Sequence, residues 1–404
     1  MPRPLPRAAI IGISGYGKIY LERLLHHADA GELEIAAATV INRPEEQAAC
    51  AGLEQRGARI HPEFHQMLEA HAGRLDLVLI PTGIHWHARM TLAALAAGAN
   101  VLVEKPLAAT IQDVREIERT APSSGRFVAV GFQDIYVEEN QEVKRRLLAG
   151  ALGRVRRIRG RGLWPRSSAY YARNDWAGRL RLDGSWVLDS PLANALAHFL
   201  NLALFLGGES EHESARPVGI EAELYRARPI ESYDTAAVRI ATAGGAEICF
   251  YASHSCERVL EPELAIDGEA GSASWTAERG WRLQGAAVRT LPGRGETPAR
   301  AAMFRSVLRR MEEPGAFVCG PAIAAQHTLC ANGAHAATVI RDVPAGQVRH
   351  QRADGAGAVQ PVIEGLERCV DRAFLSGKLL HESGCAWASP AGRISLDQFA
   401  SFPP

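Results

Sequence analysis

The chain has 404 residues, and its 45 basic and 45 acidic side chains give a formal net charge of zero. This balance argues against nucleic acid or an anionic membrane as a partner, and no uncharged apolar run is as long as a membrane helix. A chain of this length is expected to form two domains, each with its own hydrophobic core.

The cysteines and the first residues bear on where the protein works. Seven cysteines are scattered without a CxxC pair, so we expect reduced thiols in a reducing compartment. The leader MPRPLPRAAIIG lacks the apolar length and the cleavage site of a signal peptide. Both observations predict a cytoplasmic protein.

Strands and helices alternate over the first 130 residues. Apolar runs predict strands at 7–12, 33–41, 59–62, 75–80, 100–104 and 127–131. Helical spacing predicts helices at 16–27, 44–53, 63–70, 91–97 and 111–120. This alternation is typical of a doubly wound parallel sheet, which we assign to a first domain of residues 1–128.

A glycine-rich loop follows the first strand. Its spacing departs from strict GxGxxG, because Ser14 stands where the second glycine is expected. Such a loop lets a pyrophosphate approach the backbone, and the next helix supplies N–H groups. A turn without a ligand is the alternative, but the strand–loop–helix–strand context favours dinucleotide binding. The predicted contacts are Gly12, Ser14, Gly15, Tyr16 and Gly17.

The second strand leads into Asn42 and Arg43, with no carboxylate before Glu45. A carboxylate normally takes the ribose hydroxyls of NAD, whereas Asn42 suits a hydroxyl and Arg43 suits a 2′-phosphate. We therefore expect NAD or NADP as cofactor, with NADP slightly favoured. The alternative is that Arg43 is a solvated residue at the start of a helix.

The strand at 100–104 ends in Glu104-Lys105-Pro106. Open parallel sheets bind ligands beyond the carboxyl ends of their strands, so this edge is the expected position for chemistry. Lys105 is one of only four lysines, in a chain that otherwise uses arginine for positive charge. Gln133 and Asp134 follow the strand at 127–131 at the same edge, where contacts with cofactor or substrate are expected. Pro81, Thr82 and Gln133 are predicted cofactor contacts.

With the glycine loop, Pro81-Thr82, His85-Trp86-His87 and Glu104-Lys105-Pro106 in place, the chain resembles the Gfo/Idh/MocA family of NAD(P)-dependent oxidoreductases. This family is named for glucose–fructose oxidoreductase and inositol dehydrogenase. The likeness covers almost the whole chain, and the strand-ending EKP is its most specific motif. It implies that His85 and His87, in a loop after the fourth strand, lie near the nicotinamide. No metal is expected, because this HxH pattern has no carboxylate or cysteine at ligand spacing.

The resemblance also implies a second, α+β domain, residues 129–404. Its large, mostly antiparallel open sheet would carry helices on one face, and the other face usually mediates dimer or tetramer contacts. We therefore expect a homodimer or homotetramer. Strands are predicted at 155–163 and in several runs between 218 and 275, helices at 142–149, 322–340 and 361–376, and a docked extended tail at 387–402.

Residues 189–201 are predicted to form one helix, on which Asn194 and His198 share a face. Similar family members have Asp and His at this spacing, so the resemblance makes His198 the candidate acid/base; a structural role is the alternative. Asn194 and Asn201 stand where Asp is commoner, and an amide cannot take a proton or raise the pKa of the histidine. Asp189 is as well suited to capping the helix as to contacting substrate.

A stretch without periodicity holds Trp164, Arg166, Tyr171, Arg173 and Trp176. Aromatic faces stack on sugar rings, and arginines donate to hydroxyls or carboxylates, so these residues are candidates for substrate binding. A packed crossover loop or a subunit contact is an equal alternative, because the same residue types dominate interfaces.

These features predict an NAD(P)-dependent oxidoreductase that acts on the CH–OH group of a sugar, sugar derivative or cyclitol. Lys105 is expected to hold the reacting oxygen, His198 to exchange its proton, and Glu104 to steady Lys105 or to contact the cofactor. Two alternatives remain. One is a cofactor-dependent enzyme with no net redox change, such as an elimination or a glycoside cleavage. The other is a non-catalytic NAD(P)-binding sensor or scaffold.

Overall fold

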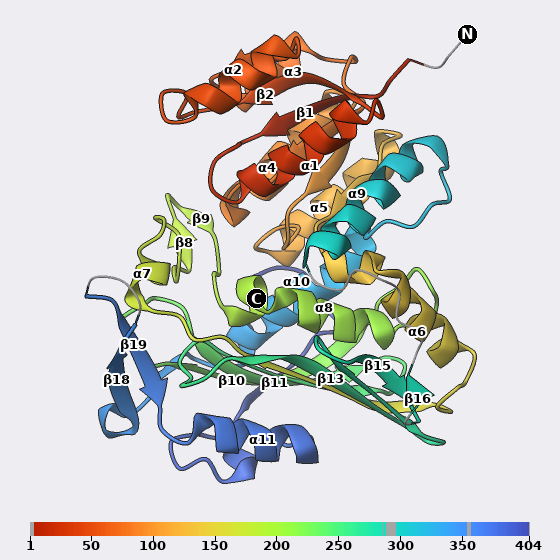
Figure 1. The fold of residues 1–404 in the computed structure, drawn as a ribbon. Coiled ribbons are helices and arrows are strands. Elements are labelled where there is room, and N and C mark those ends of the chain that lie inside the picture. Colours follow the sequence, from red (N-terminus) through yellow and green to blue (C-terminus); the bar gives the residue numbers. More distant parts are fainter. Residues whose placement is uncertain (1–3, 285, 288–295, 354–356, 404) are drawn as a thin grey trace. The chain divides into compact units, whose positions relative to one another are not determined.

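The computed structural model describes residues 4–284, 286–287, 296–353 and 357–403 (Figure 1). The chain divides into two compact units. The first contains Met1–Ala108, Asp113–Phe132 and Arg300–Ala322; the second contains Ala109–Gln112, Gln133–Ala299 and Ile323–Pro404. The sequence analysis assigned everything after 128 to the second domain. The structure differs because a late segment, Arg300–Ala322, returns to the first unit.

The first unit is built on a six-stranded parallel sheet in the order β3-β2-β1-β4-β5-β6, as predicted. Its strands are β1 Arg7–Ile11, β2 Glu34–Thr39, β3 Arg59–His61, β4 Leu77–Ile80, β5 Asn100–Val103 and β6 Val128–Val130. The connecting helices are α1 Gly17–Asp29, α2 Gln47–Gln55, α3 Phe64–Ala70, α4 Ile84–Ala96 and α5 Ile111–Ser123. The strand order reverses between β1 and β4, which is where open α/β sheets bind ligands.

Helix α4 begins earlier than predicted. The sequence analysis put His85 and His87 in a loop and began the helix at residue 91, but the structure begins it at Ile84. Gly83 takes an extended conformation at the N-cap, and the N–H of Trp86 donates to its carbonyl at 2.9 Å, which closes the first turn. The HWH sequence is therefore helical, and only His87 of its two histidines is buried.

Helix α9, Glu296–Glu312, carries the late segment back to the first unit. Its Phe304 packs edge-on against Tyr20 of α1, with ring centroids 5.5 Å apart, and stacks on His27 at 5.8 Å. Beyond the helix, the carbonyl of Cys319 accepts a hydrogen bond from the N–H of Val130 at 2.9 Å. The late segment is therefore held by both the first helix and the last strand of this unit.

The described residues of the second unit contain a ten-stranded, mostly antiparallel sheet, as predicted. Its order is β16-β15-β14-β13-β7-β12-β11-β10-β17, with β20 of the extended tail also paired to β10. The strands are β7 Val155–Leu163, β10 Pro217–Arg226, β11 Thr235–Thr242, β12 Glu247–Ser253, β13 Leu260–Gly268, β14 Ser272–Thr276, β15 Gly280–Leu283, β16 Ala286–Ala287, β17 Arg341–Asp342 and β20 Gly392–Ser395. The β7–β12 and β10–β17 pairs are parallel.

Two short strand pairs and several helices complete the second unit. The pairs are β8 Arg181–Leu182 with β9 Ser185–Trp186, and β18 Val348–Arg352 with β19 Val359–Ile363. The helices are η1 Gln133–Tyr136, α6 Glu138–Leu148, α7 Ser168–Tyr171, η2 Pro191–Ala195, α8 Ala197–Leu206, α10 Pro321–Ala337, η3 Ala345–Gln347, α11 Leu366–Ser376 and η4 His381–Ser383. The helix predicted at 361–376 begins only at Leu366, because residues up to Ile363 pair with β18.

Helices cover both faces of the large sheet, not one face as expected from the resemblance. Figure 1 shows α8 and α10 on one face and α11 on the other. The two-residue alternation of β7 explains the arrangement: Ile158 approaches the end of α8, whereas Arg159 donates to the carbonyl of Phe374 in α11 at 2.8 Å. The expected homodimer or homotetramer stays a prediction.

Two cysteines differ from the expectation of reduced thiols. Cys369 of α11 and Cys385 form a disulfide with their Cα atoms 5.8 Å apart, because the chain turns back after α11. The five other cysteines are buried and form no disulfide with a described residue: Cys50, Cys249, Cys256, Cys319 and Cys330. Within the parts of the chain that the structure describes, no helix has the length and apolar character needed to span a bilayer.

Lys144 of α6 is a buried lysine whose ammonium closes the end of α8. Only 1 % of the residue is exposed, and Nζ donates to the carbonyls of Phe205, Gly208 and Glu213, the last two at 2.9 and 3.0 Å. Burial lowers the pKa of Lys144 to about 7. A cation at a helix C-terminus satisfies carbonyls that the helix leaves without donors.

We expect Lys144→Met to lower the free energy of unfolding by about 3 kcal/mol, because these carbonyls would stay buried without their donor. Denaturant unfolding checks this. Lys378→Met is the matched control, because Lys378 is exposed. Equal denaturation midpoints for the two variants would contradict the prediction.

Candidate active site

The glycine loop after β1 has the geometry that a dinucleotide requires. Gly12 and Gly15 have φ angles of +87° and +54°, and the space around Gly15 is open. A Cβ on Gly17 would lie 2.5 Å from the carbonyl oxygen of Gly12. Helix α1 then begins at Gly17, and no described side chain caps its N-terminus. The residues present therefore fit a pyrophosphate group.

The loops after β1 and β4 lie against each other. A Cβ built on Gly12 would meet Thr82 Cγ2 at 3.4 Å, and one built on Gly17 would meet Pro81 Cγ at 3.7 Å. The predicted cofactor contacts Pro81 and Thr82 are thus brought together with the glycine loop at the point where the strand order reverses.

The predicted ribose contacts follow β2. Ser14 Oγ donates to Asn42 Oδ1 at 3.0 Å, which joins the glycine loop to this segment. Arg43 Nη2 lies 2.6 Å from Glu54 Oε1 of α2, and both side chains are about half exposed. Arg43 is therefore an ion-paired surface residue, close in sequence to the amide that Ser14 orients.

Glu104 holds the backbone of Lys105. The residue is only 5 % exposed, Tyr20 Oη donates to its Oε1 at 2.7 Å, and the N–H of Lys105 donates to its Oε2 at 3.0 Å. Burial raises the pKa of Glu104, against the opposing effects of the Lys105 charge and the Tyr20 hydrogen bond. Glu104 therefore holds the backbone at Lys105, and its contact with the cofactor stays a prediction.

Gly131, just after β6, leaves the room that this arrangement needs. A Cβ there would lie 2.8 Å from both Glu104 Oε1 and Tyr20 Oη.

We expect Gly131→Ala to lower the free energy of unfolding by about 2 kcal/mol through overpacking. We also expect it to lower turnover roughly tenfold, because Lys105 would shift. Gly320→Ala is the control, since a Cβ there meets nothing within 4 Å. Thermal melting and steady-state turnover of the two variants check this prediction. Equal turnover rates for both variants would contradict it.

His87 lies under the Lys105 loop. Its Nδ1 is 2.7 Å from the carbonyl oxygen of Pro106, and its Nε2 is 3.1 Å from that of Thr82. Burial lowers the pKa of His87 to about 4, so the ring is neutral at pH 7. His87 therefore joins the two loops, and its contact with the cofactor stays a prediction. His85 is half-buried in the first turn of α4.

Among the described residues, no three His, Cys, Asp or Glu side chains are grouped to hold a metal.

In the second unit, the helix predicted at 189–201 is not continuous. Residues Pro191–Ala195 form a π-helical turn, in which the N–H of Leu196 donates to the carbonyl of Pro191 at 2.8 Å, and α8 begins at Ala197. Ser190, not Asp189, caps the turn, because its Oγ accepts from the N–H of Ala193 at 3.2 Å. Asn194 and His198 therefore lie on two successive helical segments.

Asp189 does not cap the helix, and its contact with substrate stays a prediction. It is buried, its Oδ1 accepts from Asn194 Nδ2 at 2.8 Å, and its Oδ2 accepts from the N–H of Gly178 at 2.7 Å. It therefore orients the Asn194 amide and anchors the preceding loop.

Asn201 is 0 % exposed, and its amide has no hydrogen-bond partner among the residues described, so it belongs to the core.

A carboxylate lies beside His198, but it does not come from the same helix. Asp134 Oδ2 is 3.4 Å from His198 Nδ1. Asp134 belongs to η1, the short turn that directly follows β6, and its neighbour Gln133 is buried. The sequence placed Asp134 at a strand end where ligand contacts are expected, but no local pattern linked it to His198.

The aromatic and arginine residues at 164–176 form a stacked cluster that includes the short helix α7. The Arg166 guanidinium lies 5.5 Å from the ring centre of Trp164 and 4.9 Å from that of Tyr170. Arg173 lies 3.7 Å from Tyr170 and 5.2 Å from Trp176. Neither arginine forms an ion pair with any described residue, so the cluster is cationic as well as aromatic.

Two neighbours of this cluster were missed. His254 Nδ1 lies 2.8 Å from the hydroxyl of Tyr171, and the Arg228 guanidinium lies 4.5 Å from the Tyr171 ring centre. Burial lowers the pKa of His254 far below its ordinary value. The Tyr171 hydroxyl is thus used inside the protein. The sequence carried no signal for this contact, because His254 follows β12 and lies far from Tyr171 in the chain.

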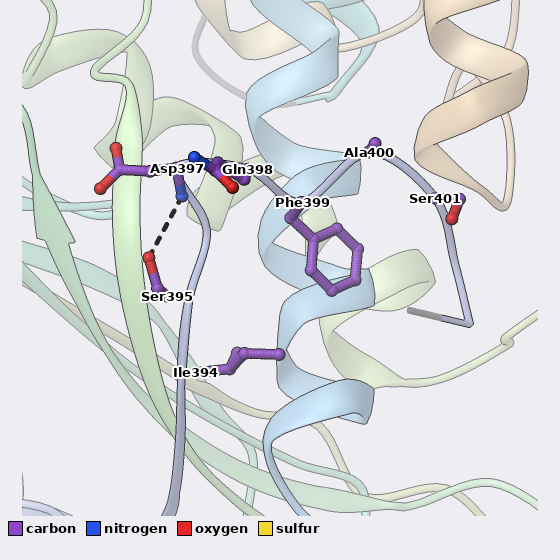
Figure 2. Close-up of a pocket in the computed structure, with 7 residues that line it drawn as sticks. All are labelled: Ile394, Ser395, Asp397, Gln398, Phe399, Ala400 and Ser401. Atoms are coloured by element: carbon purple, nitrogen blue, oxygen red, sulfur yellow. Dashed lines mark hydrogen bonds between the residues drawn. The ribbon is translucent and has the colours of Figure 1, made fainter.

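A pocket of about 570 Å³ lies elsewhere, in the C-terminal tail (Figure 2). It is lined by Ile394, Ser395, Asp397, Gln398, Phe399, Ala400 and Ser401. None of these residues is a predicted site residue, and Phe399 and Ile394 extend toward helix α10 in Figure 2. The pocket is therefore a feature of the docked tail.

Comparison with known proteins identifies the family. Residues 6–132 match the model of the Gfo/Idh/MocA oxidoreductases with an NAD-binding Rossmann fold, and residues 140–274 match that of the family's C-terminal domain. The chain belongs to the Gfo/Idh/MocA family. It is thus an oxidoreductase with the NAD-binding fold that the glycine loop predicted.

Gfo/Idh/MocA relatives give the family context. The chain is 27 % identical, over 75 % of its length and 86 % of the relative's, to dTDP-3,4-didehydro-2,6-dideoxy-alpha-D-glucose 3-reductase of Streptomyces violaceoruber. It is 31 % identical to inositol 2-dehydrogenase 3 of Saccharopolyspora erythraea, over 36 % of this chain and only 42 % of that enzyme. The WlbA dehydrogenase of Bordetella pertussis, solved with NADH and UDP-GlcNAcA, has the same fold: TM-score 0.67 and 21 % identity, over 82 % of this chain and 97 % of that one.

Proposed function

We propose that this Gfo/Idh/MocA protein transfers a hydride between NAD(P) and a secondary hydroxyl or ketone of a sugar, sugar derivative or cyclitol. The observation that carries the proposal is the fixed backbone of Lys105 at the carboxyl end of β5, held by the buried carboxylate of Glu104. The names of its relatives, a dTDP-sugar 3-reductase and an inositol 2-dehydrogenase, support this substrate class.

In the proposed reaction, each of these residues has a separate chemical role. The bound cofactor supplies or accepts the hydride. The Lys105 ammonium donates a hydrogen bond to the reacting oxygen and stabilises the negative charge that develops on it. His198 takes the hydroxyl proton during oxidation and returns it during reduction. Asn194, held by Asp189, orients a substrate hydroxyl and exchanges no proton.

The substrate loop is the second part of the proposal. Arg166 and Arg173 keep their charges without an ion pair among the described residues, and Trp164 and Trp176 flank them. Such side chains stack on sugar rings and donate to hydroxyls, carboxylates or phosphates. We assign substrate binding to this cluster together with Tyr171, which shapes the loop through His254.

The reaction itself tests the proposal. The purified protein is mixed with NAD⁺ or NADP⁺ and with sugars, cyclitols and sugar acids, and the absorbance of the reduced nicotinamide is followed. We expect net reduction of the cofactor with at least one member of the panel. Product formation without net change in the cofactor would instead indicate an elimination or a glycoside cleavage. Tight cofactor binding without any turnover would indicate a sensor or scaffold.

The choice of cofactor follows from the segment after β2. Asn42 offers the donors of an amide that Ser14 orients, and Arg43 offers a cation for a 2′-phosphate, so NADP is slightly favoured as the cofactor. We expect Arg43→Ala to weaken NADPH binding about tenfold, or about 1.4 kcal/mol, with little effect on NADH. Fluorescence titration of both cofactors checks this.

Arg56→Ala is the control for this experiment, because Arg56 is also an ion-paired surface arginine, 2.5 Å from Asp29. Glu54→Gln should strengthen NADPH binding, since it releases Arg43 from its ion pair. An Arg43→Ala variant that weakens NADH and NADPH equally would show that Arg43 does not select the 2′-phosphate.

A further inference from the structure

We propose that Asp134 is the positioning carboxylate of His198: it orients the imidazole and stabilises its protonated form when the substrate proton arrives. The inference rests on the proposed proton exchange by His198. Its basis is the ion-pair distance of 3.4 Å between Asp134 Oδ2 and His198 Nδ1. Both side chains are mostly buried, with 20 % and 12 % exposed, so solvent screens their interaction little.

The backbone that carries Asp134 is held firmly. The carbonyl oxygen of Asp134 accepts from Asn140 Nδ2 of α6 at 2.7 Å and from the N–H of Val137 at 3.2 Å. The amide oxygen of Asn140 in turn accepts from the indole N–H of Trp281, a fully buried side chain, at 2.7 Å. Turn η1 therefore presents the carboxylate from a fixed frame, as a positioning residue requires.

Asp189 is a second carboxylate close to Asn194, and it already accepts hydrogen bonds from other groups. Both oxygens of Asp189 accept hydrogen bonds, one from Asn194 Nδ2 and one from the N–H of Gly178. An aspartate at position 194 would place a second negative charge at the atom that now donates to Asp189. Like charges at this distance repel, so the amide of Asn194 fits beside Asp189 better than a carboxylate would. The carboxylate for His198 must then come from another element, and η1 supplies it.

Three other polar or charged side chains on the elements near α8 are engaged elsewhere. The Lys144 ammonium donates to backbone carbonyls at the far end of the helix. Glu139 Oε1 accepts from the backbone N–H of Trp281 at 3.0 Å. His327 Nε2 lies 2.9 Å from the carbonyl oxygen of Leu192. Among the described residues, Asp134 is the carboxylate that lies within ion-pair distance of the His198 ring.

The chemical consequence has a defined sign. A carboxylate beside an imidazole favours the protonated ring and raises its pKa. Oxidation needs neutral His198, so the rate rises with pH through that pKa. Removing the Asp134 charge should move this acid limb to lower pH and make His198 a weaker base. The separation of 3.4 Å is long for a hydrogen bond, and such contacts often shorten only when substrate binds.

Asp134→Asn is the decisive variant. We expect kcat to fall about tenfold to a hundredfold, the acid limb of the pH profile to move down by about one unit, and the affinity for cofactor to stay unchanged. Asp134→Glu should recover part of the rate. Glu138→Gln is the matched control, because it removes an exposed carboxylate from the neighbouring helix α6. A purely structural role would lower stability without moving the pH limb.

A measurement without turnover separates this inference from the proposed function. NMR of histidine-labelled protein follows the titration of the His198 ring in wild type, Asp134→Asn and Asp134→Ser. A lower pKa of His198 in either folded variant supports the inference even if no sugar is oxidised. An unchanged His198 pKa in both variants overturns it, even if the wild type proves to be a dehydrogenase.

Discussion

Lys105→Ala is expected to lower turnover about a hundredfold or more and to leave the fold intact. The ammonium is proposed to stabilise the charge that develops on the reacting oxygen, and alanine offers no donor. The backbone at this position is fixed independently of the side chain, since the N–H of Lys105 donates to Glu104 Oε2 at 3.0 Å. The loss should therefore appear in kcat more than in the binding of cofactor.

Steady-state rates, cofactor titration and thermal melting test this together. Lys18→Ala is the matched control, because Lys18 is an exposed lysine of the same unit, 3.4 Å from Glu46. Lys105→Arg adds a sharper comparison: arginine keeps the charge but is a larger, planar donor, so it should recover only part of the rate. A Lys105→Ala variant with wild-type turnover would remove the main support for the proposed function.

The second large effect concerns stability in acid. Burial lowers the pKa of His87 and of His335 to about 4, and it also lowers that of His61, His71 and His254. These imidazoles titrate near 6.5 in the unfolded chain, which therefore binds more protons than the folded one between about pH 6.5 and 4. Stability is then complete above about pH 6.5 and is lost as the pH falls toward 4.

The size of this effect is considerable. His87 is 1 % exposed, and its shift alone corresponds to about 3 kcal/mol at pH 4 and below. Burial also raises the pKa of Glu104 and Glu223, and this works in the opposite direction. The net expectation is a steep fall in the urea midpoint on moving from neutral pH to about pH 5.

Removing one of these histidines should flatten the pH dependence. The His335 ring lies 5.1 Å from the Tyr233 ring and 6.0 Å from the Phe402 ring, so phenylalanine suits that environment. We expect His335→Phe to lose less stability than wild type between neutral pH and about pH 5. His350→Phe is the control, because His350 is exposed. Identical pH dependence in wild type and His335→Phe would contradict this account.

Much of the first unit was predictable because its signals are local. Apolar runs and helical spacing predicted the parallel sheet, and the glycines at 12, 15 and 17 predicted a loop that the structure builds with positive φ angles and a close backbone approach. The prediction of a loop from local sequence was wrong at His85-Trp86-His87, because helix α4 begins directly after the extended N-cap residue Gly83. It was also wrong at 189–201, where a π turn interrupts the helix.

In the candidate site, too, some features were predictable from local sequence and others were not. Position along the chain was enough to place Lys105 at the end of a strand and to select His198 by its resemblance to family members. The Asp134 carboxylate beside His198 could not be found this way, because Asp134 and His198 lie on η1 and α8, separated by many elements. The contact of Tyr20 with Glu104, and of Tyr171 with His254, was hidden for the same reason.

The sequence by itself determined the class of sheet, the dinucleotide loop and the lysine at the strand end, because each is encoded in neighbouring residues through periodicity, turn chemistry and strand polarity. Only the tertiary structure decided which carboxylate meets His198, that Arg300–Ala322 joins the first unit, and that α11 covers the second face of the large sheet. Those outcomes depend on how side chains far apart in the chain pack together, and packing is a property of assembled elements.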